Sequence, residues 1–328
     1  MNNHPKKIAF ISEHASPLAH LGGVDTGGQN VYVAQLAKHL TERGHTVDIY
    51  TRKEDISMEN VIDWLPNIRV INIQAGPVRP IPKEEILDFM PEFDEQMQLF
   101  INHEKLHYDL VHANFFMSGL IAMSLKLNMG IPFVITFHAL GHVRKLHQKE
   151  ADKFPEERLD IETLICKEAD QIIAECPQDR DDLVQYCKAD RKKIAIVPCG
   201  FSQTEFYPIH KDIARKILRI DPHEKVLLQL GRMVPRKGID NVIRSVATLK
   251  KKSDQKVKLL IVGGNKENMA ESSCPEYKRL SDLVSSLGIA GQVEFAGKKS
   301  REHLKFYYAA ADVFITTPWY EPFGITPL

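Results

Sequence analysis

Short apolar runs that alternate with amphipathic stretches constrain the fold of this chain more than any other feature of its sequence. In the first part, the runs predict strands at residues 6–12, 47–51, 69–73, 110–113, 133–137, 171–174 and 194–197. Residues 29–43 and 159–167 have the apolar spacing of helices. Residues 84–107 predict another helix, which is broken at Pro91. Near-continuous apolar strands separated by helices are typical of parallel sheets that are covered on both faces.

The same alternation starts again after a turn at residues 198–200. The second series predicts strands at residues 225–230, 258–262, 293–296 and 312–316, and helices at residues 239–249, 277–287 and 301–310. Two series predict two doubly wound α/β domains, which we place at residues 1–205 and 206–328. Ligands of such domains bind beyond the carboxyl ends of the strands, so the loops there are the candidate site.

Composition excludes several classes of protein. Lys+Arg and Asp+Glu both number 43, and a net charge of zero argues against nucleic acid as a partner. We expect no transmembrane segment and no secretory signal, and therefore a cytoplasmic protein, although peripheral membrane contact stays open. The 5 cysteines lack C-x-x-C spacing, which predicts buried free thiols instead of disulfides or zinc ligands. The oligomeric state is left open.

The loop between the first strand and the first helix is rich in glycine: Gly22-Gly-Val-Asp-Thr-Gly-Gly-Gln-Asn30. Gly27 and Gly28 lie just before the helix, where backbone N–H groups and the helix dipole favour an anion. The pattern is neither G-x-G-x-x-G nor a Walker loop, which argues against a standard dinucleotide or P-loop site. We interpret the loop as a contact to phosphate or sugar, and a flexible turn is the alternative.

Charged residues follow two strands of the second series. The turn at residues 231–238 contains Arg232 and Lys237, which together could hold a diphosphate. Glu321 follows the last strand, where a carboxylate can accept hydrogen bonds from sugar hydroxyls. Taken one at a time, a solvated basic turn and an acidic first helical turn are the alternatives.

Histidines lie at the ends of several strands. His138 is expected to point from its strand toward the ligand crevice, with a packed core histidine as the alternative. For His14 and His112 the packed interpretation is favoured. No acidic residue is spaced to complete a metal site with them, so we expect no bound metal.

Together these loops resemble the retaining, nucleotide-sugar-dependent glycosyltransferases of family 4, over essentially the whole chain. Residues 25–33 resemble the glycine loop of the sucrose-phosphate synthase and inositol-phosphate glycosyltransferase branch. Residues 231–238 are similar to the donor-phosphate turn, and residues 321–328 resemble the opening of the Glu-x7-Glu motif. The resemblance implies a GT-B fold of two facing Rossmann-like domains. The first would take the acceptor and the second the nucleotide sugar, with no metal or other cofactor.

The resemblance also implies roles for individual residues. Arg232 and Lys237 would bind the donor diphosphate, and Glu321 would contact the transferred sugar. His138 would lie near the 6-hydroxyl of that sugar. The remaining assignments are Gly27, Gly28, Phe323 and Gly324 for the donor, and Gln29, Lys83 and Arg158 for the acceptor.

Two departures from the family pattern matter. The second Glu of the motif would fall one residue past Leu328, and the last strands and C-terminal helix are missing too, so we expect an incomplete second domain. On the acceptor side, Phe115 replaces an expected aromatic hydroxyl, and Ala139 replaces a hydroxyl that some relatives carry. A phosphorylated acceptor therefore stays open, and for Lys83 and Arg158 a solvated helix charge is the alternative.

The sequence therefore predicts a retaining hexosyltransferase. It would move a hexosyl unit from a nucleotide-diphosphate sugar, of UDP type in preference to GDP type, to a sugar, polyol phosphate or lipid-linked acceptor. Arg232 and Lys237 would neutralise the leaving diphosphate. A truncated, non-catalytic chain that binds nucleotide sugars is one alternative, because the second Glu is missing. A dinucleotide-dependent oxidoreductase is the other, supported only by the α/β pattern.

Overall fold

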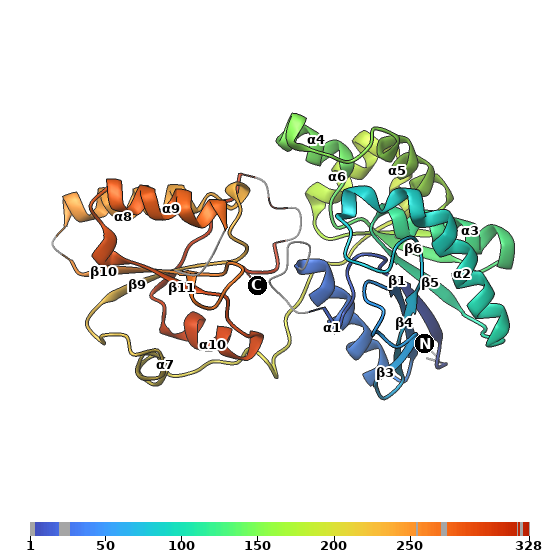
Figure 1. The fold of residues 1–328 in the computed structure, drawn as a ribbon, viewed down its shortest axis with the longest axis horizontal. Coiled ribbons are helices and arrows are strands. Elements are labelled where there is room, and N and C mark those ends of the chain that lie inside the picture. The colour runs from blue at the N-terminus through green and yellow to red at the C-terminus, as the bar shows by residue number, and fades with distance from the viewer. Residues whose placement is uncertain are drawn as a thin grey trace. The chain divides into compact units, whose positions relative to one another are not determined.

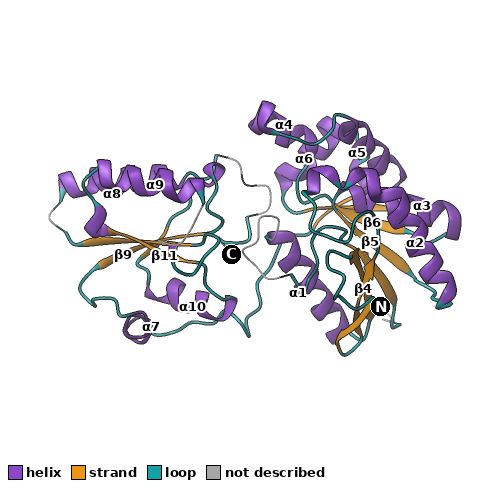
Figure 2. Ribbon diagram, viewed as in Figure 1, coloured by secondary structure: helices purple, strands orange, loops and turns teal. Residues whose placement is uncertain are grey.

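Parallel β-sheets form the centre of both parts of the chain in the computed structural model (Figures 1 and 2). The structure describes residues 4–19, 27–253, 255–269, 274–319, 321 and 324–327. Their contacts divide them into two compact units, of which the first extends to Cys199 and the second starts at Gly200. None of the helices in these ranges is long and apolar enough to cross a membrane.

An eight-stranded sheet forms the centre of the first unit. Its strands are β1 (Lys7–Ile11), β2 (Thr46–Arg52), β3 (Val61–Leu65), β4 (Ile68–Ile73), β5 (Leu110–Asn114), β6 (Phe133–Thr136), β7 (Gln171–Ala174) and β8 (Ile194–Ile196). The order is β3-β4-β2-β1-β5-β6-β7-β8, and only β3 is antiparallel to its neighbour. Because β1 lies between β2 and β5, the crossovers diverge there, and ligands of open α/β sheets bind at such a point.

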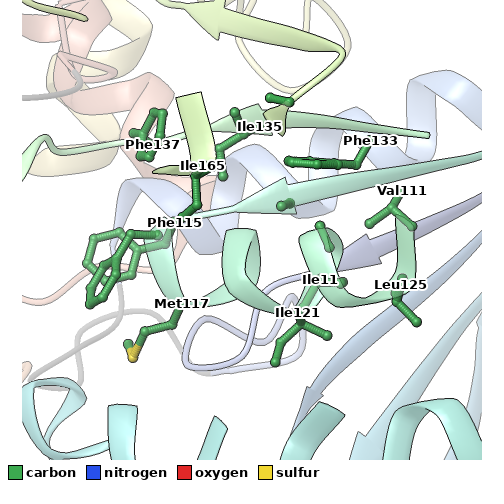
Figure 3. Packing of buried hydrophobic residues seen from close by; sticks show 14 of the residues in the cluster. Ile11, Val111, Phe115, Met117, Ile121, Leu125, Phe133, Ile135, Phe137 and Ile165 are labelled. Carbon is green, nitrogen blue, oxygen red and sulfur yellow. The ribbon is translucent and has the colours of Figure 1, made fainter. Parts of the chain in front are cut away.

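Helices cover both faces of this sheet. They are α1 (Gly28–Glu42), α2 (Met90–His103), α3 (Phe116–Met129), α4 (Gly141–Gln148), α5 (Glu157–Glu168) and α6 (Pro177–Cys187), with 3-10 turns η1 (Lys83–Glu85), η2 (Leu87–Phe89), η3 (Lys149–Ala151) and η4 (Arg191–Lys193). One core cluster joins α2, α3 and α5 to the strands, and a second joins α1 to the other face. Figure 3 shows part of the first cluster, with Ile121 and Leu125 of α3 among strand residues such as Val111.

The second unit is a smaller version of the same design. It contains β9 (Lys225–Leu230), β10 (Val257–Val262), β11 (Val293–Gly297) and β12 (Val313–Phe314), with α7 (Lys211–Leu218), α8 (Ile239–Lys252), α9 (Pro275–Ser286), α10 (Arg301–Ala310), η5 (Pro235–Lys237) and η7 (Ala290–Gln292). The sheet is parallel in the order β11-β10-β9-β12. Helices α8 and α9 cover one face, and α7 and α10 cover the other (Figure 1). Helix α8 buries Ile239, Val242, Ile243 and Val246, the spacing of an apolar stripe.

Two predicted elements differ from the structure. Pro91 does not break a long helix, because it lies in the first turn of α2, after the 3-10 turns η1 and η2. A first-turn proline is tolerated since its missing N–H would have no partner within the helix. The last strand is only Val313–Phe314, where residues 312–316 were expected, because β12 pairs with just Leu227 and Leu228 of β9.

Several elements were not predicted. Strand β3 is a half-exposed edge strand, joined to β4 by a turn at Pro66 and Asn67 in which Asn67 has a φ of 63°. An asparagine in the left-handed region is a hairpin signal that the sequence contained. Helices α4, α6 and α7 have only 8, 11 and 8 residues, too short for a strong periodic pattern.

None of the five cysteines, all of which lie among the described residues, forms a disulfide. Cys166 and Cys187 are buried, as predicted. The prediction of burial is wrong for the other three, because Cys176 is exposed and Cys199 and Cys274 are half-buried at the ends of strands or helices.

Candidate functional site

Main-chain hydrogen bonds hold the loops at the carboxyl end of the sheet in the second unit. The Gly231 N–H, just after β9, donates to Val262 O at 3.0 Å, and the Gly263 N–H, just after β10, donates to Gly297 O at 3.0 Å. A Cβ on Gly263 would lie 1.9 Å from Gly231 O, and the φ of Gly263 is 142°. Only glycine fits there, because a side chain on Gly263 would collide with the main chain after β9, so the loops after β9 and β10 pack backbone to backbone.

The turn after β9 is fastened to the segment after β12. Gly238 has a φ of 62°, and a Cβ there would lie 2.1 Å from Thr317 O. Thr317 Oγ1 donates to Gly238 O at 2.7 Å. The N–H and the indole N–H of Trp319 donate to Arg236 O and Pro235 O, both at 3.2 Å. Two loops that lie about eighty residues apart in sequence therefore form one structure, which carries both Lys237 and Glu321.

Lys237 and Glu321 form an ion pair. Lys237 Nζ donates to Glu321 Oε2, and the Lys237 side chain is only 8% exposed. Arg236 Nη1 lies 3.7 Å from Glu321 Oε1, and the Gly324 N–H donates to Oε1 at 3.4 Å. Two residues that the sequence assigned to the donor diphosphate and to the donor sugar are therefore brought into direct contact.

The charges at this site depend on one another. Burial by itself would raise the pKa of Glu321, but Lys237 and then Arg236 hold it below its usual value, so the carboxylate is ionised. Burial lowers the pKa of Lys237, Glu321 opposes that shift, and the positive charges of Arg236 and Arg232 add to it. Arg232 therefore lies close enough for its charge to act on Lys237. The site joins three cations, one carboxylate and exposed main chain, which suits an anion that also carries hydroxyl groups.

In the first unit, His138 is the second residue after β6. Its Nε2 lies 3.0 Å from Asn114 Oδ1 and its Nδ1 lies 3.2 Å from Glu175 Oε1. The side chains of His138 and Glu175 are 6% and 8% exposed. His138 is therefore held between two strand ends, those of β5 and β7, and does not stand clear of the sheet as expected.

Burial favours the uncharged forms of His138, His112 and Glu175. It lowers the pKa of His138 to about 3, with His14 adding to the shift and Glu13 opposing it. It lowers the pKa of His112 to about 3 and raises that of Glu175 to about 9. His112 is packed, as favoured from the sequence, and its Nε2 lies 2.9 Å from Thr136 Oγ1.

The start of α1 is tied to the same end of the sheet. Gln29 Nε2 donates to Ser12 Oγ at 3.1 Å and to Asn114 O at 3.2 Å. The Gly27 N–H donates to Asn30 Oδ1 at 2.9 Å, and Gly28 is the first residue of α1. The rest of the glycine loop and Phe323 lie outside the described residues.

Arg158, at the start of α5, is buried and not solvated. It is 1% exposed, and its guanidinium carbon lies 4.7 Å from the ring centres of Phe115 and Phe116 and 4.5 Å from that of Phe154. Its Nε donates to Glu162 Oε1 at 2.7 Å. The alternative of a solvated helix charge is therefore wrong for Arg158, because three aromatic rings and a carboxylate enclose it.

One nitrogen of the Arg158 guanidinium makes no hydrogen bond within the described part of the chain. Nη2 donates to Ala139 O, whereas Nη1 is buried and has no hydrogen-bond partner among the described residues. Arg158 also lines a hollow of about 550 Å³ between α4, η3 and the start of α5, together with Lys145, Lys149 and Phe154. Lys83 does not line this hollow and is half-buried in η1.

Two residues of the first unit were missed in the sequence. Glu175 directly follows β7. A carboxylate after a predicted strand was also the signal that drew attention to Glu321, although β12 ends at Phe314. Asn114 closes β5 and holds His138. Within the described ranges no three His, Cys, Asp or Glu residues are grouped as metal ligands.

Comparison with known proteins identifies the family of the chain. Residues 26–204 match the family model Glycosyltransferase Family 4, and residues 210–328 match the model Glycosyl transferases group 1. The sequence is 35% identical to mannosylfructose-phosphate synthase of Agrobacterium fabrum, over 98% of this chain and 73% of that protein. It is 32% identical to D-inositol 3-phosphate glycosyltransferase of Rhodococcus opacus, over 100% of this chain and 73% of that protein.

Solved structures show the same fold. Sucrose-phosphate synthase of Thermosynechococcus elongatus superposes with a TM-score of 0.86 at 34% identity, over 98% of this chain and 77% of that chain. HepE of Anabaena, at 19% identity and a TM-score of 0.70, shares the fold over 98% of this chain and 77% of that one. The two Rossmann-like units, the family models and these relatives lead to one conclusion: the chain belongs to glycosyltransferase family 4 and is a glycosyltransferase of the GT-B fold.

Proposed function

We propose that this glycosyltransferase moves a hexosyl unit from a UDP-type sugar to a hydroxyl of a phosphorylated sugar or polyol, with retention of configuration. The acceptor hydroxyl attacks the anomeric carbon from the side on which the diphosphate leaves. The bond from that carbon to the diphosphate oxygen breaks, and a diphosphate oxygen takes the proton of the hydroxyl. The retaining outcome rests on the family resemblance.

The charges of the second unit support a nucleotide diphosphate as the donor. Lys237, Arg232 and Arg236 concentrate positive charge beside a backbone that only glycine permits. Positive charge at a leaving diphosphate stabilises the transition state, and the three cations can supply it without a metal. Glu321 is the acceptor of hydrogen bonds for the hydroxyls of the hexose.

The buried, incompletely bonded guanidinium of Arg158 carries the proposal of a phosphorylated acceptor. A buried nitrogen without a hydrogen bond costs about 1–3 kcal/mol, and a phosphate oxygen at Nη1 would remove that cost. The adjoining hollow of about 550 Å³ is large enough for a sugar phosphate. The names of the two relatives and of sucrose-phosphate synthase each contain a phosphorylated compound.

The test compares acceptors with and without phosphate. The 328-residue chain is assayed with UDP-, GDP- and ADP-glucose against hexose phosphates, inositol phosphate and their dephosphorylated forms, and the anomer of the product is assigned by NMR. We expect UDP-glucose and phosphorylated acceptors to give the highest kcat/KM. Arg158→Gln should lower kcat/KM for the phosphorylated acceptor by about 100-fold, or about 2.7 kcal/mol, and leave the donor KM unchanged.

Lys126→Ala is the matched control, because Lys126 also forms an ion pair, with Asp170, but lies in α3. Equal kcat/KM for phosphorylated and dephosphorylated acceptors in the unaltered chain would overturn the acceptor proposal, whether or not Arg158→Gln folds. An inverted product would overturn retention.

A further inference from the structure

Glu175 is a buried carboxyl group that the proposed reaction does not use. It directly follows β7, its side chain is 8% exposed, and its Oε1 lies 3.2 Å from His138 Nδ1. Its backbone N–H donates to Asp179 Oδ2 at 3.0 Å. The contact with His138 raises the question of which of the two groups carries the hydrogen.

The hydrogen bonds of Asn114 first establish the state of the other ring nitrogen, Nε2. Its Nδ2 donates to Ile11 O and to His112 O, each at 3.3 Å, which assigns the amide orientation and leaves Oδ1 as an acceptor. His138 Nε2 lies 3.0 Å from Oδ1, so Nε2 carries a hydrogen. The tautomer of His138 therefore follows from its neighbours on β1 and β5.

A neutral His138 with its hydrogen on Nε2 has a lone pair on Nδ1. Burial keeps the ring neutral, because it lowers the pKa of His138 to about 3. The 3.2 Å contact with Glu175 then needs a hydrogen from Glu175, which a carboxylic acid has and a carboxylate lacks. Burial also raises the pKa of Glu175 to about 9, so the acid is the main form at neutral pH.

His138 needs such support because of its backbone. Its φ is 60°, and the Ala139 N–H donates to Phe137 O at 2.7 Å, so the chain makes a strained three-residue turn. Ala139 O in turn accepts a hydrogen bond from Arg158 Nη2. The turn thus connects the Glu175–His138 pair to the guanidinium that we assign to the acceptor phosphate.

We propose that Glu175 is a positioning residue: as a neutral carboxylic acid it donates its O–H to His138 Nδ1, and so holds the ring and the strained turn on which Arg158 rests. The tautomer follows from the structure, and the effect on turnover rests on the proposed function. Loss of the Glu175 hydrogen places a carboxylate against the Nδ1 lone pair. The ring is then no longer held, and transfer to the acceptor declines.

Burial favours the neutral form of Glu175, and several titratable groups face the pair. Glu175 acts electrostatically on Asp179 of α6, Cys199 after β8 and Tyr32 of α1, and Glu13 and His14, just after β1, act on His138. The pKa values of Cys199 and Tyr32 are raised to about 12, so both stay neutral up to pH 9. Burial raises the pKa of Asp179 to about 6, and the hydrogen bond from the Glu175 N–H opposes that shift.

Two substitutions of Glu175 distinguish the effect of its donated hydrogen from the effect of its negative charge. In Glu175→Gln, the amide can donate to His138 Nδ1 and cannot ionise, whereas Glu175→Leu has a similar size and no donor. Asp179→Asn is the matched control, because it changes the neighbouring carboxyl and leaves Glu175 intact. The pH profile of kcat/KM is measured from pH 6 to 10 for each variant, with thermal unfolding as a check on folding.

We expect kcat/KM of the unaltered chain and of Asp179→Asn to fall above about pH 9, as Glu175 loses its hydrogen. Glu175→Gln should keep its activity at pH 7.5 within about threefold and show no decline up to pH 10, while Glu175→Leu should lose about 10- to 30-fold at every pH. A Glu175→Gln profile with the same alkaline decline as the unaltered chain would overturn the proposal.

A second measurement does not depend on turnover. Long-range ¹H–¹⁵N spectra of the 328-residue chain at pH 7.5, with His138→Asn to assign the signals, report which ring nitrogen carries the hydrogen. The Nε2–H form is expected in the unaltered chain and in Glu175→Gln. An imidazolium or an Nδ1–H form would overturn the proposal even if no acceptor for the enzyme were found, so the two proposals fail separately.

Discussion

The carboxyl ends of the two sheets differ in whether their side chains are neutral or ionised. In the first unit, burial holds His138, His112 and Glu175 in their neutral forms, linked by hydrogen bonds. In the second unit, Lys237 and Glu321 form an ion pair, and the charges of Arg232 and Arg236 act on it. The same parallel β-α-β design thus carries a neutral hydrogen-bonded site in one unit and a charged one in the other.

The difference suits the ligands that we propose for the two sites. Directed hydrogen bonds between neutral groups position a ligand without attracting its charge, and they fix tautomers and ring orientation. Concentrated positive charge attracts an anion and stabilises an anionic leaving group. It also brings cations close together, and they repel one another. The comparison predicts that changes of charge strongly affect the carboxyl end of the second sheet, and that the carboxyl end of the first sheet responds mainly to the loss of a hydrogen-bond donor. Arg158 lies in α5 and is not part of this comparison.

The largest effect is expected for Lys237→Ala. Removing the buried cation should lower kcat by about 100-fold or more, which corresponds to about 2.7 kcal/mol of transition-state stabilisation. Steady-state kinetics with saturating donor measure it. Lys258→Ala is the control, because Lys258 also pairs with a carboxylate, Glu294, but lies within β10. Turnover of Lys237→Ala within about threefold of the unaltered chain would remove Lys237 from the mechanism.

Glu321→Gln should separate binding from turnover. Glu321 competes with a diphosphate for Lys237, so its neutralisation should tighten UDP binding by about 3- to 10-fold. Turnover should fall by about 10- to 100-fold, because the hexose loses a charged hydrogen-bond acceptor. Titration calorimetry with UDP and steady-state kinetics give the two values. Weaker UDP binding in Glu321→Gln would show that the pair organises the donor site instead of competing with the donor.

Metal removal should have little effect. If the three cations act on the donor diphosphate as we propose, EDTA should leave turnover within about twofold of its value without EDTA. Addition of Mg²⁺ after EDTA provides the control. A complete loss of activity that Mg²⁺ restores would contradict the assignment of the diphosphate charge to Lys237 and Arg232.

The smallest effect concerns the histidines of the first unit. The pKa values of His138 and His112 are lowered to about 3 by burial, so both rings stay neutral when the pH falls from 8 to 5.5. Their NMR ring signals should not shift over that range, whereas both should titrate near pH 6.5 in the urea-unfolded chain. A midpoint between pH 5.5 and 8 in the folded chain would show that the first unit tolerates charge as the second does.

Much of the fold could be predicted from local pattern. The apolar runs that became β1, β5, β6, β9 and β10 were visible because a strand buried on both faces needs an unbroken apolar sequence. Strand β3, which is half-exposed at an edge, lacks that signal. Pro91 was placed inside a helix because the sequence does not show where that helix begins. Tertiary packing decides where α2 begins, and Pro91 lies in its first turn.

The candidate site could be predicted where charged residues and glycine occur in one loop. Arg232, Lys237 and Glu321 were found in this way, and the structure brings Lys237 and Glu321 into contact. Glu175 was missed because a single carboxylate after a strand has no meaning until its neighbours are known. Arg158 was left between a ligand contact and a solvated charge, since the rings of Phe115, Phe116 and Phe154 surround it only in the folded chain.

The sequence by itself determined the α/β class, the two series of strands and the family, because periodicity and loop motifs are local properties of a chain. Only the tertiary structure decided which strand ends meet, and therefore that His138 lies between Asn114 and Glu175 and that Arg158 is enclosed. The physical reason is burial. Whether a carboxyl, an imidazole or a guanidinium is charged and to which group it bonds depends on groups that are dozens of residues away in sequence.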